Sequence, residues 1–217
     1  IGLVMANDGA PMPVDRVLSN IVDCEYFQDG EKFLRNGGQK GRQSAVLTAG
    51  YYRIHPLLFK VQPAVKITHI ESDKVGIVTV LDGAPMPIGQ MAAQPVAGHD
   101  SFQNPEAFVS NGGCRGLQEQ IILAGTYNIN PWFCEIEEHP LFEVPIGYVG
   151  VVVSFVGDDA KDISGDAFTH GNIVRRGGKG VWEEPLYPGK HPLNTRVMKI
   201  ELVPTTNTVL NWASART

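Results

Sequence analysis

The side chains best suited to chemistry in this sequence, histidine and cysteine, are scattered singly along the chain. The six histidines show no i,i+2 or i,i+4 pairs of the kind that metal sites use, so we expect no metal: His55, His69, His99, His139, His170 and His191. The three cysteines, Cys24, Cys114 and Cys134, are odd in number and include no C-x-x-C pair. This argues against a disulfide framework or a zinc site and favours a reducing compartment. None has a consistent histidine or acidic partner nearby, so we do not expect a nucleophilic cysteine.

Two further segments invite a chemical interpretation. Asp158, Asp159, Asp162 and Asp166 form an acidic loop that could attract calcium, but they lack the D-x-D-x-D-G spacing, so we interpret them as a solvated loop. The run 177–180, Gly-Gly-Lys-Gly, could cradle a phosphate, but a glycine turn is the better account, because the equivalent Gly-Gly pairs at 37–38 and 112–113 have the pattern of turns. There is also no G-x-S-x-G, P-loop or H-E-x-x-H motif. The sequence therefore predicts a protein that is not an enzyme and that holds no cofactor.

Composition points to a chain of short β elements. The 217 residues are 43% hydrophobic and 19% charged, which argues against disorder and coiled coils, and the 24 glycines and 15 prolines are spread throughout. The net charge of −5 argues against a nucleic-acid surface. No apolar run approaches the roughly 20 residues that span a bilayer, and residues 146–157 are rich in glycine and β-branched residues, as in a buried strand. Because the chain starts with isoleucine, we expect a fragment or a processed chain.

The chain repeats itself. The hexapeptide Asp-Gly-Ala-Pro-Met-Pro occurs at residues 8–13 and again at 82–87, and the apolar segments before it, at 2–4, 76–78 and 150–152, have the same spacing of 74. A later glycine cluster recurs at 36–41, 111–116 and 176–180, followed nine residues on by Gly50, Gly125 and Gly189. These matches predict three tandem units at 1–74, 75–148 and 149–217.

Each unit has the pattern of a small β module. An apolar strand is expected at 1–5, 75–81 and 148–156, then a variable loop such as 14–33, and then a glycine turn. Alternating strands follow at 44–47 and 119–123, and final strands at 133–137 and 197–202. Helical periodicity is weak, with one short turn of helix expected at 104–109. The predicted fold class is mainly β, with adjacent units packed end to end because each core is small.

The three tryptophans allow two interpretations. Trp132, Trp182 and Trp212 each lie close to a unit's strands, which favours a packing role. An exposed strip of tryptophans would instead form a stacking platform, typical of a carbohydrate-binding or other ligand-binding β-repeat protein. Solvent exposure distinguishes the two.

The third unit resembles a known family. The segments 144–153, 171–182, 186–194 and 203–212 are similar to the first, β-rich part of the band-7 or SPFH domain of stomatins, prohibitins and flotillins, most of all to large flotillin-like bacterial members. The resemblance covers about 70 of 217 residues, without the family's α/β second half or its helical region. Tandem β units before such a domain also resemble the architecture of the major vault protein.

This resemblance implies a non-enzymatic scaffold. Band-7 proteins associate with membranes and assemble side by side into rings or cages, often around membrane proteases or within lipid microdomains. We therefore expect many copies in a homo-oligomer at a membrane, the bacterial inner membrane in the first instance, with the membrane-binding segment outside this fragment and no nucleic-acid partner. The alternative is a soluble, vault-like shell protein in the cytoplasm.

The two hexapeptides are the candidate turn or oligomer-contact segments. Proline in them limits strand pairing and glycine permits a sharp reversal, so equivalent turns would meet neighbouring protomers at equivalent places. The candidate residues are Asp8, Gly9, Pro11 and Pro13 in the first unit, and Asp82, Gly83, Pro85 and Pro87 in the second.

Overall fold

The computed structural model describes residues 1–158, 163 and 172–206. The chain divides into two compact units, Ile1–Pro140 and Leu141–Thr217. The first contains two copies of the module predicted from the sequence, and the second contains the third copy. All the sheets are small and almost entirely antiparallel, which confirms the mainly β prediction.

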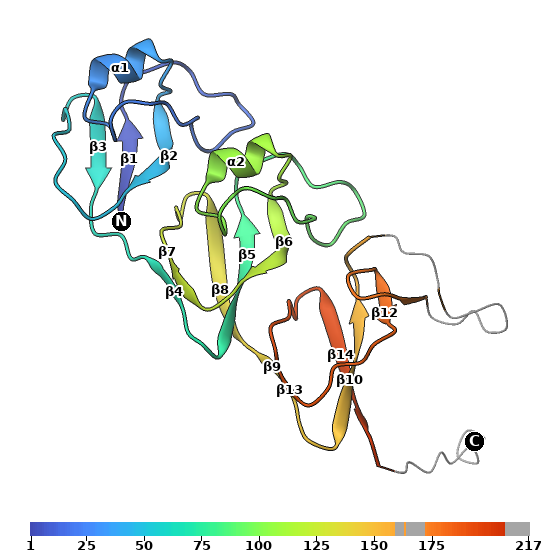
Figure 1. Ribbon diagram of the computed structural model, residues 1–217. Helices are drawn as coiled ribbons and strands as arrows, with labels where there is room; N and C mark the ends of the chain where they lie inside the picture. The colour runs from blue at the N-terminus through green and yellow to red at the C-terminus, as the bar shows by residue number, and fades with distance from the viewer. Residues whose placement is uncertain (159–162, 164–171, 207–217) are drawn as a thin grey trace, which may run out of the picture. The chain divides into compact units, whose positions relative to one another are not determined.

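The first two repeats have the same three-stranded sheet (Figure 1). In repeat 1 the order is β2 (Gly41–Leu47), β1 (Gly2–Ala6) and β3 (Phe59–Gln62). In repeat 2 the order is β6 (Gly116–Ile122), β5 (Lys74–Val80) and β8 (Cys134–Pro140). The register slips at the same point in both, between Leu3 and Met5 and between Ile77 and Thr79. Equivalent residues therefore face the core in each repeat.

A short helix precedes the glycine turn in both repeats. The sequence predicted one at 104–109, and α2 (Pro105–Ser110) confirms it. It did not predict α1 (Gly30–Arg35), which is equivalent to α2. Both helices start at a side chain that caps the first turn, Asp29 accepting from the Lys32 amide and Asn104 from the Ala107 amide. With six residues each, the helices have too few turns for periodicity to show, so only the capping residue marks them.

A strand pair that the sequence did not predict connects the end of the first predicted unit, 1–74, with repeat 2, and its first strand leads into that repeat. β4 (Thr68–Ile70) runs antiparallel to β7 (Gly125–Tyr127), with Ile70 opposite Gly125. Three residues are too few for an alternating pattern to be recognised, which explains why this pair was missed.

The second unit repeats this plan. β10 (Tyr148–Ser154) pairs with β14 (Met198–Pro204) and β12 (Gly180–Trp182), and β12 with β11 (Ile173–Val174). β9 (Phe142–Val144) runs antiparallel to β13 (Gly189–His191), with Val144 opposite Gly189. The strand that leads into the repeat is therefore present here as in repeat 2.

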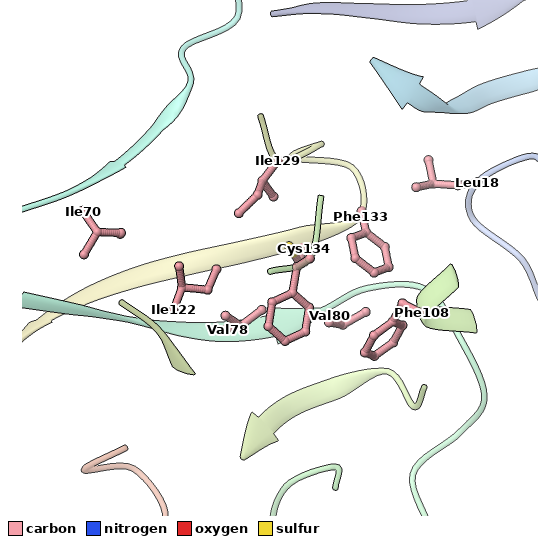
Figure 2. Close-up of a cluster of buried hydrophobic side chains, with 10 residues drawn as sticks. Leu18, Ile70, Val78, Val80, Phe108, Ile122, Ile129, Phe133 and Cys134 are labelled. Atoms are coloured by element: carbon pink, nitrogen blue, oxygen red, sulfur yellow. The ribbon is translucent and has the colours of Figure 1, made fainter. Parts of the chain in front are cut away.

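Each repeat has its own apolar core. In repeat 1, Phe27, Phe33 and Phe59 contact one another through tilted and edge-on rings. In repeat 2, Phe102, Phe108 and Phe133 are fully buried. The third core is built on Val152, Trp182 and Leu186. The core of repeat 2 also includes Leu18, which belongs to repeat 1 (Figure 2).

Candidate repeat-contact and assembly sites

Both hexapeptides form the same turn at the end of the first strand of their repeat. Gly9 and Gly83 have φ values of 140° and 124°, which L residues with a side chain rarely adopt. A Cβ at Gly9 would lie 2.4 Å from the Gly38 carbonyl oxygen, and one at Gly83 would lie 2.6 Å from that of Gly113. Glycine is therefore required for both its backbone conformation and its lack of a side chain.

After the glycine the chain turns outward. Ala10 and Ala84 each form one bridge, to Gln39 and Cys114. The four candidate prolines, Pro11, Pro13, Pro85 and Pro87, then lie exposed, with no ladder pairing among the described residues. The chain therefore turns at the glycine of each hexapeptide, and the oligomer-contact role of the two segments stays a prediction.

The two aspartates differ sharply in their surroundings. Asp82 is 1% exposed, and both its oxygens lie 3.2 Å from Nε of Arg16 in repeat 1. The same carboxylate accepts backbone N–H groups from Val17 at 3.1 Å and Leu18 at 3.2 Å, and from its own neighbour Gly83 at 3.0 Å. Asp82 is thus the acceptor for a whole loop of the preceding repeat, in charge-assisted hydrogen bonds.

Asp8 occupies the equivalent position in repeat 1 but is exposed. Its side chain accepts one hydrogen bond, from the Gly9 amide at 2.8 Å. The turn-forming contact to the following glycine is therefore common to both aspartates, whereas the contacts to Arg16, Val17 and Leu18 occur at Asp82 alone among the described residues.

Further contacts join repeat 1 to repeat 2, among them a hydrogen bond from the Ile21 amide to the Glu106 carboxylate at 3.1 Å. Asn130 is buried and donates to the carbonyls of Gln43 and Ser44 at 3.0 and 3.1 Å. The guanidinium of Arg42 lies over the Trp132 ring, 5.3 Å from its centroid. Leu18 inserts beside Phe108 and Phe133, as Figure 2 shows. The contact between these repeats therefore combines a buried leucine side chain with hydrogen-bonded polar groups.

The sequence analysis missed Arg16, Leu18 and Asn130, although one signal was present. Repeat 2 has Gln90 at the position of Arg16, and repeat 3 has Val156 at the position of Asp82. In the next repeat along the chain, therefore, neither Arg16 nor Asp82 has a charged counterpart. Comparing the Arg16 position of one repeat with the Asp82 position of the next repeat, instead of comparing equivalent positions, would have indicated this pair.

Two of the residues expected to be chemically inert, His99 and Asp158, take part in contacts within the fold. Nδ1 of buried His99 accepts the Phe102 amide at 2.8 Å, so Nε2 carries the proton and donates to Gln120 at 3.2 Å. No group of three or more His, Cys, Asp or Glu that could hold a metal occurs among the described residues. Asp158 forms a bridge with Gly178, while Asp159, Asp162, Asp166 and His170 lie outside the described residues.

Burial holds two of the three thiols in the neutral form. Desolvation raises the pKa of the Cys134 thiol to about 12 and also raises that of Cys24, both of which lie in apolar cores. A thiolate is the reactive form, so neither is placed for nucleophilic chemistry at neutral pH. Cys114 is partly exposed.

Both described tryptophans contact protein groups. Trp182 is 6% exposed, donates to the Gly178 carbonyl and lies beneath Arg176, and Trp132 lies beneath Arg42. These are packing roles, the interpretation that the sequence favoured. Trp212 lies outside the described residues.

No family model, curated protein or solved structure matches this chain. The resemblance of the third unit to the band-7 family therefore stays a prediction that rests on the residues quoted above. In the described part of the chain, neither helix has the length or the apolar character needed to cross a membrane.

Proposed function

We propose that this protein is a non-enzymatic scaffold whose copies assemble side by side into a ring or cage. The observation that carries the proposal is a repeated exposed side chain. Val14 and Ile88 directly follow the two hexapeptides, and both are as exposed as in an extended chain, at 106%. They occupy equivalent positions in repeats 1 and 2. A neighbouring protomer with the same repeats can therefore bind both side chains at equivalent surfaces.

The geometry explains why these side chains point outward. Met12 and Met86 turn back, so that a Cβ at Gly41 or Gly116 would meet their methyl groups at 3.5 and 3.1 Å. The following proline keeps the chain out of the sheet. The next residue, Val14 or Ile88, is thereby left at the tip of the loop.

An isolated exposed aliphatic residue is ordinary on a protein surface. A repeated one favours a heterologous interface, in which the tip of one protomer contacts a different surface of the next and the series closes by rotation. Several weak and equivalent contacts then act together, because the second forms at high effective concentration once the first is made. This supports an assembly of many copies over a simple dimer.

The membrane part of the proposal comes from the flotillin-like resemblance of the third unit. In this proposal, the ring or cage binds a membrane through a segment outside this chain and surrounds or organises membrane proteins. A soluble, vault-like shell would use the same lateral contacts without lipid.

The assembly is tested with the full chain by negative-stain electron microscopy and light scattering. The wild type is expected to form closed particles, and the double variant Val14→Asp/Ile88→Asp to remain monomeric with an unchanged Tm. Ile146→Asp is the matched control, because Ile146 is also highly exposed, at 93%, but does not follow a hexapeptide. A monomeric wild type, or particles that persist in the double variant, would contradict the proposal.

Flotation with vesicles of phosphatidylethanolamine and phosphatidylglycerol separates the two settings. The protein in its longest natural form is expected to float with the vesicles. Intact particles that stay at the bottom of the gradient would contradict the membrane scaffold and favour the soluble shell.

A further inference from the structure

A cavity of about 320 Å³ lies beside the first residues of repeat 1. Its walls include Gly2, Leu47 and Val61, and its rim includes Gly50 and Tyr52. We call it the Gly2 groove. The residues around it have direct counterparts in repeats 2 and 3, which show what such a groove holds.

In repeat 2 the equivalent site is filled by Ile70, the last residue of β4. A Cβ built on Gly76 would lie 3.2 Å from Ile70, 2.9 Å from Ile136 and 3.4 Å from Ile122. Ile70 is 1% exposed, and β4 is held in place by its ladder with β7. The lead-in strand thus contributes both backbone pairing and one buried aliphatic side chain.

Repeat 3 has the same arrangement with a different residue. A Cβ on Gly150 would lie 3.3 Å from Val144, the last residue of β9, and 2.9 Å from Ile200. Val144 is 2% exposed and lies opposite Gly189 in the ladder of β9 with β13. A branched aliphatic residue therefore fills this place twice in one chain.

In repeat 1, two of the three walls are present. A Cβ on Gly2 would meet Leu47 at 3.4 Å and Val61 at 3.6 Å, the counterparts of Ile122 and Ile136. No described side chain takes the place of Ile70 there. The segment 50–52, the counterpart of β7 and β13, has no ladder partner among the described residues, and Tyr51 within it is fully exposed.

We propose that the Gly2 groove binds an extended polypeptide strand, antiparallel to residues 50–52, whose last residue is a branched aliphatic opposite Gly50. The unpaired backbone of 50–52 supplies hydrogen bonds, and the groove supplies a pocket for one side chain, the two elements of strand addition at a sheet edge. A small hydrocarbon would fill the pocket but leave those backbone groups unpaired.

The rest of this end of repeat 1 supports a polypeptide partner. Asp8 is exposed, whereas its counterpart Asp82 binds the loop of a preceding repeat. Leu58 is partly buried, whereas its counterpart Phe133 is completely buried beside Leu18. The surface that repeat 2 buries against repeat 1 thus recurs on repeat 1 in a less buried form. This inference rests on the equivalence of the repeats and does not depend on the lateral assembly proposed above.

The test adds a lead-in strand to the chain. Because Ile1 corresponds to Val75, a copy of residues 68–74 joined ahead of Ile1 places its isoleucine in the register of Ile70. The matched control is the same extension with aspartate in place of that isoleucine. The readouts are Tm and amide hydrogen exchange.

The isoleucine extension is expected to raise Tm by several degrees and to slow exchange of the Tyr52 region at least about tenfold, and the aspartate extension to do neither. Gly2→Val, which fills the groove from within, should remain folded and cancel the gain. The proposal is overturned if both extensions behave alike. It is also overturned if a small apolar probe such as toluene saturates the groove while the extension has no effect on Tm or exchange. A third contrary result would be slowed exchange of the groove residues only when the chain dimerises at rising protein concentration.

Discussion

The guanidinium of Arg16 lies 3.2 Å from the carboxylate of Asp82, whose side chain is fully buried while that of Arg16 is 15% exposed. This pair joins a loop of the first repeat to the sheet of the second. Nη2 of Arg16 is buried without a hydrogen-bond partner among the described residues, so the pair is not fully compensated. Such a pair specifies how two modules meet more than it adds to their stability.

Removing the acid of this pair should be costly. Asp82→Ala leaves the buried guanidinium and the amides of Val17 and Leu18 without their acceptor, so we expect the free energy of unfolding to fall by about 3 kcal/mol. Asp8→Ala is the matched control, because within the described part of the chain the same residue in the same hexapeptide accepts a hydrogen bond from the Gly9 amide alone, and it should change stability by less than about 0.5 kcal/mol. Urea denaturation measures both; equal effects would refute the assigned role of Asp82.

Equivalent glycines should differ in their tolerance of a methyl group. Gly76→Ala places a Cβ 2.9 Å from Ile136 in a filled core, and overpacking of this kind costs about 1–3 kcal/mol. Gly2→Ala meets nothing nearer than 3.4 Å and should be close to neutral. Thermal unfolding of the two variants gives the comparison, and a large loss in Gly2→Ala would show that the Gly2 groove is already filled in solution.

The turn between β4 and β5 should confer acid sensitivity. Lys74 donates hydrogen bonds to the carboxylates of Glu71 and Glu138, and these raise the pKa of Lys74. The bond from Lys74 lowers the pKa of Glu71 below its ordinary 4.5, with a smaller contribution from nearby His69. A carboxyl with a lowered pKa contributes stability above its ordinary value and loses it as the pH falls through the folded pKa.

Wild-type Tm should therefore decline below about pH 4.5 more steeply than that of Lys74→Gln, in which Glu71 has lost this partner. On the alkaline side the contribution of Lys74 persists through pH 10.5, because its pKa is raised. Parallel Tm curves for the two proteins between pH 3 and 7 would show that the ion pair does not form in solution.

The three cysteines should differ in reactivity. Cys24 and Cys134 are 3% exposed with raised pKa values, whereas Cys114 is partly exposed. A thiol reagent such as Ellman's should modify Cys114 alone in the native chain and all three cysteines in denaturant. Cys114→Ser should abolish the native reaction. Rapid native labelling of Cys134 would mean that the core of repeat 2 opens readily.

Much of the local structure follows from the sequence, since it depends on residues close together along the chain. The alternating strands, the glycine turns and the helix at Asn104 result from backbone conformation and side-chain periodicity within short windows. The repetition of the hexapeptide predicted that the strands before it would be equivalent, and β1 and β5 show the same bulge. The strands β4 and β9 escaped prediction because they are too short to show a period.

The sequence by itself determined that residues 8–13 and 82–87 form the same turn, because glycine and proline restrict the backbone wherever they occur. Only the tertiary structure decided that Asp82 is buried and Asp8 exposed. The two hexapeptides are identical, so the difference comes from residues outside them. A carboxylate becomes buried where another part of the chain brings donors to it, and the loop at Arg16–Leu18 reaches Asp82.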